Sequence, residues 1–325
     1  MTIMLKEVDR VEILTLQDNY IDLLVRDNNE VIQRAMIVKG TEIRRNSVLA
    51  EHGFSALVTT TVEDNSRSLL FDFGFSPHGA ASNAQVLEAD FGRVEVLALS
   101  HGHLDHFGGL KELAALVERS GIEMIVHPEV FRNPRYIKAG DDRKINFPPF
   151  TREEAESAGV RVVETLGPYP LLDNEGLFLG EIKRSTDFEK GVPAFWYGEG
   201  AQARPDTFED DTGLAFLVKG RGLVVLTGCA HAGIINTIYH ARDLTGVDKV
   251  LAVIGGFHLS GPDLKPVVRA TIEAFKELAP EYIIPTHCTG REVIGMIEEE
   301  LPDSFILNMA GTKLTFSGKQ GLQPY

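Results

Sequence analysis

The heptapeptide Ser100-His101-Gly102-His103-Leu104-Asp105-His106 places three histidines and one aspartate within six residues. The apolar run before it, residues 94–99, is typical of a buried strand, and residues 107–116 after it indicate the start of a helix. Imidazole nitrogens and a carboxylate suit zinc, iron or manganese. Ligands on a strand-to-helix turn converge on a metal while leaving some of its positions open. The heptapeptide therefore predicts a catalytic metal site rather than a closed structural one.

The spacing within the heptapeptide also indicates which side chains act together. Alternation along an extended chain puts His101, His103 and Asp105 on one side, and His106 then opens the helix. The alternative is a chance cluster of surface histidines. The whole chain has 10 histidines, so three of them within six residues after a buried strand favour metal ligation.

Length and composition bound the kind of protein. The 325 residues are 43% hydrophobic and 24% charged, which indicates a folded protein of one large domain or two modest ones. The net charge of −15 disfavours a nucleic-acid partner, because nucleic-acid binders usually carry a basic face. Residues 1–10 lack the apolar core of a signal peptide, and no apolar run of about 18 residues predicts a membrane span. Because the chain has only two cysteines, we expect a reduced, cytoplasmic protein. We also expect a small-molecule substrate, and the oligomeric state stays open.

Periodicity divides the chain into three parts. The first and last thirds contain strands and helices, whereas residues 128–205 carry many prolines and aromatic residues and have weak periodicity. We interpret 128–205 as an insertion or lid beside the site. The predicted strands include 11–16, 54–60, 68–73, 124–126, 214–218, 223–226, 250–254 and 282–284, and the predicted helices are 83–91, 105–120, 234–244 and 266–278. They predict a single α/β (α+β) domain over residues 1–325, with two mixed sheets flanked by helices.

Two motifs of the chain resemble those of the metallo-β-lactamase superfamily, whose fold is an αββα sandwich. The heptapeptide is similar to the second motif of that superfamily. Leu70-Phe71-Asp72-Phe73-Gly74 is similar to the first, an apolar strand that ends in Asp and Gly. The resemblance extends from about residue 50 to 315 and is weakest in the middle insertion. It implies the αββα fold and a role for Asp72 in orienting the metal-binding loop from behind the ligands.

The resemblance also implies a division of the ligands between two metals. His101 and His103 would bind the first metal, while Asp105 and His106 would bind the second. Asp105 could also act as a general base. Residues 285–290 resemble the last superfamily motif, which makes His287 a ligand of the second metal; a core histidine with satisfied hydrogen bonds is the alternative.

Two further stretches depart from the superfamily pattern. Residues 223–229 resemble the fourth motif, but Cys229 stands where that motif has a bridging Asp. A thiolate can bind zinc, although a small buried hydrophobic residue is the alternative. His231, two residues on, could supply the missing ligand. The third motif should offer a histidine, yet none lies between His127 and His231, so Asp210 is either its replacement or a turn-forming acid.

Three more residues are candidates for contact with a substrate. His258 follows a buried strand in a glycine-rich turn, where it could act as an acid or base, bind substrate, or simply be held by a hydrogen bond. His52 precedes a core strand. Arg184, in the insertion, could meet a phosphate or carboxylate, although a solvated charge run is the more common explanation.

Three short segments give the most specific indication of function. Residues 227–233, 255–259 and 287–290 resemble one subgroup, the dihydropterin-ribofuranosylaminobenzene phosphate synthases of methanopterin biosynthesis. Such enzymes join a dihydropterin methyl diphosphate to an aminobenzene ribosyl phosphate with loss of diphosphate. The resemblance implies a metal-dependent enzyme for a small phosphorylated or pterin-like molecule, using one or two divalent transition-metal ions, with zinc favoured over iron or manganese. The alternative is a metal-dependent hydrolase of an ester, lactone or phosphodiester.

Overall fold

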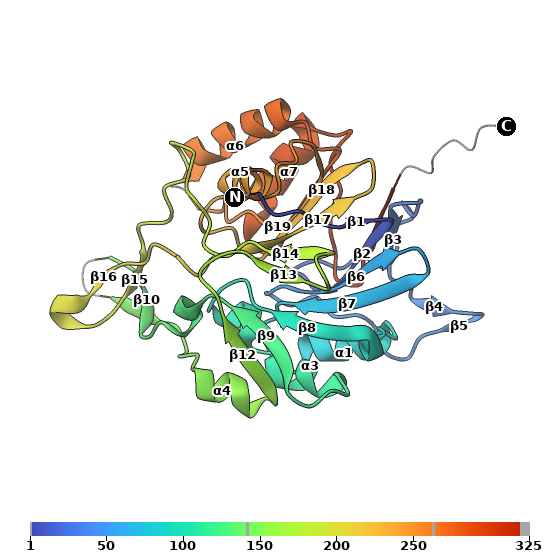
Figure 1. Ribbon diagram of the computed structural model, residues 1–325, viewed down its shortest axis with the longest axis horizontal. Helices are drawn as coiled ribbons and strands as arrows, with labels where there is room; N and C mark the ends of the chain where they lie inside the picture. The colour runs from blue at the N-terminus through green and yellow to red at the C-terminus, as the bar shows by residue number, and fades with distance from the viewer. Residues whose placement is uncertain (1, 141–142, 262–263, 319–325) are drawn as a thin grey trace.

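Two β-sheets packed face to face form the centre of the molecule, with helices on both outer sides (Figure 1). The computed structural model describes residues 2–140, 143–261 and 264–318. The layers follow the order helix, sheet, sheet, helix, which confirms the predicted αββα sandwich.

The lower sheet in Figure 1 has eight strands and contains the strand before the heptapeptide. In spatial order these are β12 (Val160–Glu164), β9 (Ile122–Val126), β8 (Val94–Ala98), β7 (Asn65–Phe71), β6 (Ser55–Val62), β2 (Arg10–Gln17), β21 (Lys313–Ser317) and β3 (Ile32–Gln33). Strands β7, β8, β9 and β12 run parallel, and β6 pairs with β7 as an antiparallel hairpin. The heptapeptide therefore follows the carboxyl end of an interior strand.

The upper sheet has seven strands, most of them from the C-terminal half of the chain. It contains, in order, β13 (Tyr169–Leu171), β14 (Gly176–Phe178), β17 (Gly213–Val218), β18 (Gly222–Thr227), β19 (Val250–Gly256) and β20 (Tyr282–Thr286), with β1 (Glu7–Val8) beside β17. Strands β18, β19 and β20 are adjacent and parallel. The loops that follow these three strands consequently emerge at the same edge of the sheet.

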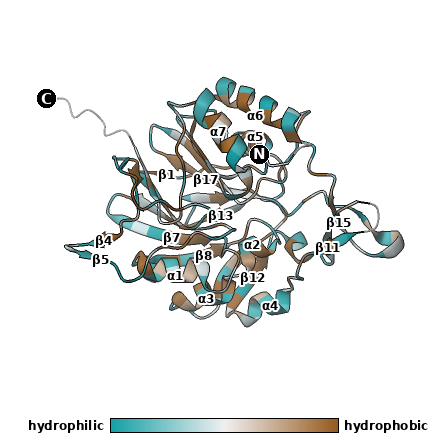
Figure 2. Ribbon diagram, turned by 180° about the vertical axis from the view of Figure 1, so that it is seen from behind, coloured by the Kyte–Doolittle hydropathy of each residue, from teal (hydrophilic) through white to brown (hydrophobic). Residues whose placement is uncertain are grey.

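Amphipathic helices close the two outer faces. The lower sheet is covered by α1 (Gly79–Val86), α2 (Leu104–Phe107), α3 (Leu110–Leu116) and α4 (Arg152–Ser157), and the upper sheet by α5 (Ile234–Thr245), α6 (Lys265–Leu278) and α7 (Arg291–Glu300). In α6, for example, Val268, Ile272 and Phe275 recur at helical spacing and are buried. Figure 2 shows hydrophilic residues on the outer sides of α4 and α6. Short 3-10 turns are η1 (Phe91–Arg93), η2 (Pro128–Phe131), η3 (Gly200–Gln202) and η5 (His287–Thr289).

The main hydrophobic core lies between the two sheets. Phe71 and Phe316 from the lower sheet meet Phe178 and Phe216 from the upper sheet in one buried cluster. Burial of each such side chain stabilises the fold by roughly 1.5–3 kcal/mol relative to exposure. The shared core holds the two sheets in register, and with them the loops at their common edge.

Residues 128–205 divide between the central sheets and a separate small sheet. Strands β12, β13 and β14 belong to the two central sheets, and β12 extends the lower one by pairing with β9. The small sheet, at the left of Figure 1, consists of β10 (Arg135–Lys138), β11 (Lys144–Asn146), β15 (Phe195–Tyr197) and β16 (Arg204–Pro205). A hairpin of β4 (Val38–Lys39) and β5 (Glu42–Ile43) projects at the opposite side. The part that stands apart from the sandwich is therefore narrower than the predicted insertion.

Two predicted helices differ from the structure for local reasons. The helix predicted over 105–120 is divided into α2 and α3 at Gly108 and Gly109, where a Cβ would collide with carbonyl oxygens of the preceding loop. The helix predicted over 83–91 lies earlier, as α1, because the chain turns at Glu88, which has a left-handed backbone with φ of 56°.

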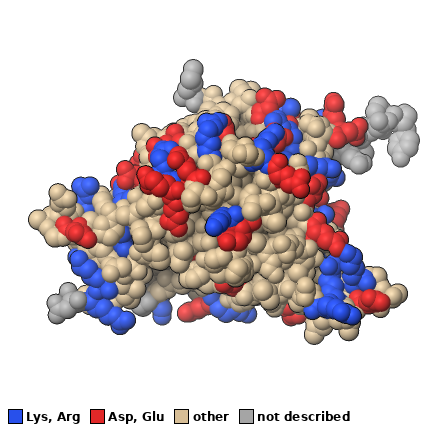
Figure 3. Space-filling model, turned by 90° about the horizontal axis from the view of Figure 1, so that it is seen from below, with Lys and Arg blue, Asp and Glu red and all other residues tan. Residues whose placement is uncertain are grey.

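The surface below the lower helices carries both charge signs. Figure 3 shows basic side chains in small clusters between acidic ones, around a largely uncharged centre. Across the described part of the chain, none of the helices has both the length and the apolar character needed to span a bilayer.

Candidate metal centre

Ligand-type side chains from four loops meet at one edge of the sandwich. The heptapeptide follows β8 of the lower sheet, and the other loops follow β18, β19 and β20 of the upper sheet. Together they contribute His101, His103, Asp105 and His106, then Cys229 and His231, then His258, and finally His287 and Cys288. The topology thus brings together residues that are far apart in the sequence.

The first group consists of His101, Cys229 and His231, whose ligand atoms all lie within 4.8 Å of one another. The ring centroid of His103 lies 4.7 Å from that of His101 and 4.9 Å from that of His231. Among the residues that the structure describes, no hydrogen-bond partner reaches the buried Nε2 atoms of the three histidines. Burial holds the pKa of each ring well below its usual range, so the rings are neutral at neutral pH. Neutral imidazoles with unsatisfied buried nitrogens fit a metal ion.

The second group consists of Asp105, His106, Cys229 and His287, again with ligand atoms within 4.8 Å of one another. Asp105 Oδ2 lies 3.0 Å from His287 Nε2, and His106 Nε2 lies 3.1 Å from Cys229 Sγ. Cys229 is a member of both groups. The two groups thus separate His101 from Asp105 and His106, and both contain the sulfur of Cys229.

Asp72 orients the heptapeptide from behind. Its carboxylate accepts hydrogen bonds from Ser100 N and Ser100 Oγ, both at 2.7 Å, and lies 2.6 Å from His106 Nδ1. The residue is fully buried and has a left-handed backbone with φ of 56°. The ring of His106 is therefore fixed with its other nitrogen directed towards the second group.

We expect Asp72→Ala to weaken both folding and metal binding. The change leaves Ser100 and His106 without their buried partner, which should cost roughly 3 kcal/mol of unfolding free energy. Loss of a partner behind a ligand should also lower metal affinity by about 10- to 100-fold. Denaturant unfolding and metal titration measure the two effects. Asp72→Asn, which keeps the size and one acceptor, should lie between the variant and the wild type; equal affinity in all three proteins would contradict the assigned role.

His106 differs from the other histidines in its charge. Burial lowers its pKa, but the Asp72 and Asp105 carboxylates outweigh burial and raise the pKa to about 9. The ring therefore carries a proton at neutral pH when no metal is bound. A metal must displace that proton to bind Nε2, which makes metal affinity rise with pH.

His287 is positioned by residues near the N-terminus that the sequence analysis did not identify. Its backbone N–H donates to Asp18 Oδ1 at 2.9 Å, and its Nδ1 lies 3.2 Å from both Gly53 N and Asn19 Oδ1. Burial raises the pKa of Asp18 to about 6. His287 itself has a left-handed backbone with φ of 43°, and its ring faces Asp105. No sequence motif pointed to Asp18, because it precedes the recognisable motifs.

Two further buried acids hold the loop that carries His231. Asp211 Oδ2 accepts from Ala232 N at 2.9 Å. Glu189 Oε1 and Oε2 accept from the N–H groups of Ile235 and Asn236 at 2.9 and 2.8 Å, at the start of α5. Sequence reasoning missed both acids, since their partners are backbone groups.

Asp210 and Arg184, predicted as a ligand and a substrate-binding residue, are occupied by other contacts. Asp210 accepts from Gly102 N at 2.9 Å and from Arg135 Nη2 at 2.8 Å, and it belongs to neither ligand group. Arg184 Nη2 donates to Thr207 O at 2.6 Å, and its Nη1 lies 3.4 Å from two other backbone carbonyls. In this arrangement Asp210 supports the heptapeptide, and Arg184 supports the loop of His231.

His52 and His258 lie on different sides of the ligand groups. His52 is half-exposed, and its Nε2 lies 3.4 Å from Asp105 Oδ2. Its ring centroid is 4.5 Å from that of His287. His258 instead lies beside His231, with ring centroids 4.2 Å apart, and belongs to a third group together with the two cysteines.

Three phenylalanines form an aromatic wall over the histidines. Phe147 stacks on His103 with centroids 4.5 Å apart and planes at 2°, and Phe208 stacks on His231 at 4.1 Å and 5°. Phe195 of the small sheet lies 5.6 Å from both histidine rings. The abundance of aromatic residues in 128–205 was a sequence signal for Phe147 and Phe195, whereas Phe208 lies beyond that segment and had none.

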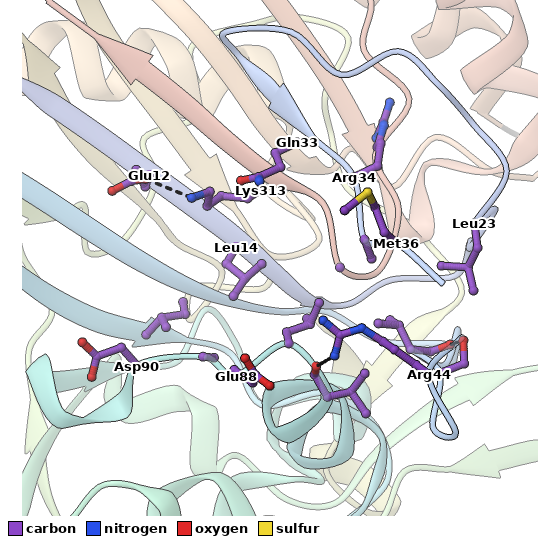
Figure 4. A pocket seen from close by; sticks show the side chains of 18 of the residues that line it. Glu12, Leu14, Leu23, Gln33, Arg34, Met36, Arg44, Glu88, Asp90 and Lys313 are labelled. Atoms are coloured by element: carbon purple, nitrogen blue, oxygen red, sulfur yellow. Dashed lines mark hydrogen bonds and ion pairs between the residues drawn. The ribbon is translucent and has the colours of Figure 1, made fainter. Parts of the chain in front are cut away.

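A cavity of about 460 Å³ lies elsewhere, between the lower sheet, the end of α1 and the segment before β5 (Figure 4). Its charged side chains already have partners: Lys313 pairs with Glu12 at 3.4 Å, and Arg44 Nη1 donates to Val86 O at 2.8 Å. None of the groups of potential metal ligands found among the described residues lies there.

Comparison with known proteins agrees with this geometry. The family model of the metallo-beta-lactamase superfamily matches residues 52–287. A 7,8-dihydropterin-6-methyl-4-(beta-D-ribofuranosyl)-aminobenzene-5'-phosphate synthase of Methanocaldococcus jannaschii is 32% identical over 276 residues, which is 82% of this chain and 90% of the synthase. An uncharacterized protein of the same organism, MJ0448, is 29% identical over 77% of this chain and 88% of its own length.

Among solved structures, Tm1679, described as a metal-dependent hydrolase of the beta-lactamase superfamily, is 25% identical with a TM-score of 0.69. The alignment covers 94% of this chain and 99% of that one. A named synthase and a metal-dependent hydrolase among the relatives confirm the prediction that the chain is an enzyme. The family model matches more than half of the chain, and the matched residues include all members of the two ligand groups. The chain belongs to the metallo-beta-lactamase superfamily.

Proposed function

We propose that this protein is a metal-dependent transferase for a phosphorylated, pterin-like small molecule, with diphosphate as the leaving group. The observation that carries the proposal is the 32% identity to the dihydropterin synthase across 90% of that enzyme. The match between the ligand groups and the motifs that resemble this subgroup supports it further.

The two ligand groups fit two divalent transition-metal ions. His101 and His231, with the neighbouring His103, would hold one, and Asp105, His106 and His287 the other, with Cys229 a member of both groups. A metal bound here would supply Lewis acidity, which stabilises negative charge that develops on a phosphate oxygen. The thiolate and the histidines favour zinc, while the carboxylate also suits iron and manganese.

Asp105 and His52 form the proton-handling pair of this proposal. Asp105 Oδ2 contacts both His287 Nε2 and His52 Nε2, at 3.0 and 3.4 Å. The half-exposed His52 ring can exchange protons with solvent, whereas Asp105 is mostly buried. Asp105 would accept the proton of the attacking amine or water, and His52 would pass it to solvent.

We expect Asp105→Asn to reduce turnover by roughly 10²- to 10⁴-fold, the range of a lost general base. The amide keeps the shape but cannot accept a proton, and it binds metal less well. Steady-state rates together with metal content per chain separate the two losses. Asp64→Asn, on the exposed turn between β6 and β7, is the matched control and should behave like the wild type. Near-normal turnover in Asp105→Asn would exclude the assigned role.

A metal-dependent hydrolase of an ester, lactone or phosphodiester is the second candidate function. The similarity to the metal-dependent hydrolase Tm1679 over nearly its whole length favours it. The same Asp105–His52 pair would then activate water instead of an amine.

One assay separates transfer from hydrolysis. The zinc-loaded protein is incubated with dihydropterin methyl diphosphate, with and without an aminobenzene ribosyl phosphate, and the released diphosphate is measured. Transfer requires that release depends on the amine and that a condensed product forms. Release without the amine, or no turnover of this donor alongside cleavage of generic phosphodiesters, would reject transfer in favour of hydrolysis.

A further inference from the structure

Cys288 and His258 are ligand-type side chains that the two-metal centre does not use. Together with Cys229 they form a third group, in which one sulfur or nitrogen atom from each residue lies within 4.8 Å of the others. Both cysteines are free thiols. The group therefore combines two sulfurs and one imidazole nitrogen.

The upper sheet explains why these three residues meet. Strands β18, β19 and β20 are adjacent and parallel, and each is followed by one member of the group. Cys229, His258 and Cys288 each lie two residues beyond the last residue of their strand. The carboxyl ends of these neighbouring parallel strands lie at the same edge of the sheet, and this brings the three positions close together.

Local backbone features direct the side chains inward. His258 has a left-handed backbone with φ of 43°. A Cβ on Gly256 would lie 2.5 Å from Cys288 Sγ, so only a glycine leaves space for that sulfur. Within the described structure, His258 Nδ1 is buried and has no hydrogen-bond partner. This buried nitrogen lies beside two thiols, so a metal ion at this position would satisfy it.

We propose that Cys229, His258 and Cys288 form a binding site for a soft, closed-shell metal cation such as Cu(I) or Cd(II). Thiolates select soft ions, and a site with two thiolates and one imidazole is richer in sulfur than either catalytic ligand group, which has one thiolate. Two sulfurs that each lie about 2.3 Å from one tetrahedral ion, the zinc–sulfur distance, are roughly 3.8 Å apart. The ligand atoms of this group lie within 4.8 Å of one another, which is compatible with that separation.

The site shares Cys229 with the catalytic centre, and this consequence rests on the proposed function. A soft cation bound by Cys288 and His258 withdraws the Cys229 sulfur from the two ligand groups. Soft cations should therefore inhibit the enzyme by displacing its metal.

Cadmium titration tests the site directly. The zinc-loaded protein, kept reduced with a phosphine, is titrated with Cd²⁺ while sulfur-to-cadmium absorption is followed in the ultraviolet. X-ray absorption at the cadmium edge should show two sulfurs and at least one nitrogen bound to cadmium.

The variants test each member of the group. Cys288→Ser should lose about half of the sulfur-to-cadmium absorption and one sulfur neighbour of cadmium. His258→Ala should bind cadmium more weakly than its control His240→Ala. His103→Ala should keep the band.

The outcomes separate the two sites. A single sulfur neighbour of cadmium in the wild-type protein would overturn the soft-metal site, and this measurement does not depend on the folding of any variant. An unchanged absorption band in Cys288→Ser would overturn it as well. A wild type that binds no zinc, yet binds cadmium through two sulfurs, would support the soft-metal site and contradict the catalytic centre.

Discussion

Replacing His103 with alanine should remove metal from the first ligand group and reduce turnover by on the order of 10³-fold or more. The Nε2 of His103 is buried beside the rings of His101 and His231. A missing ligand leaves the ion weakly held, and Lewis-acid stabilisation is worth several kcal/mol of the barrier, with about 1.4 kcal/mol for each tenfold change in rate. Elemental analysis per chain and steady-state rates measure the two losses.

Packing has to be separated from ligation in this variant, because His103 also stacks on Phe147. His103→Phe retains an aromatic ring in the stack but offers no nitrogen, so it should lose metal as His103→Ala does. His78→Ala removes an exposed histidine outside the site and should leave both metal and rate unchanged. Full metal content in His103→Phe would show that His103 is a packing residue.

The sandwich could be predicted because its strands carry their pattern locally. Residues 94–99 and 250–254 are short, continuous apolar runs bounded by turns, as expected for strands covered on both faces. Gly108 and Gly109 show the limit of this reasoning. A helical periodicity continues through them, although two consecutive glycines disfavour a helix locally. The nearby carbonyl oxygens of Phe73 and Phe75, which leave no room for a Cβ at these positions, are visible only in the structure.

The candidate site was predictable where its ligands are close in sequence. The heptapeptide contributes side chains to both groups, and His287 and Cys229 follow strands with recognisable motifs. Asp210 illustrates what spacing cannot decide. Its position along the chain fits a ligand, but the fold turns both of its oxygens to Gly102 and Arg135.

Tertiary structure likewise decides the sulfur-rich part of the site. His258, predicted as an acid or base or a substrate-binding residue, and Cys288, which no motif assigned, become neighbours of Cys229 only because β18, β19 and β20 are adjacent. The order of parallel strands in a sheet follows from packing between distant segments. A pattern within one segment does not carry that information, so the third group was visible only in the structure.

Replacing Cys229 with alanine should have an effect as large as that of His103→Ala, but on both metals. Cys229 Sγ belongs to the group of His101 and His231 and also to the group of Asp105, His106 and His287. Its side chain is 2% exposed, so the loss of a buried sulfur also affects packing. Cys229→Ser keeps the volume without a thiolate; metal loss in both variants would assign the effect to ligation.

Cys229→Asp is the decisive partner of that experiment. It places a carboxylate where the resembled superfamily motif carries a bridging Asp, and a carboxylate prefers harder ions than a thiolate does. We therefore expect Cys229→Asp to keep two metals, to recover more turnover than Cys229→Ser, and to shift its preference from zinc towards manganese. Metal competition followed by elemental analysis measures that shift. If Cys229→Ala and Cys229→Asp both bound as much zinc as the wild type, the sulfur would be a packing atom and the two-metal assignment would lose its shared ligand.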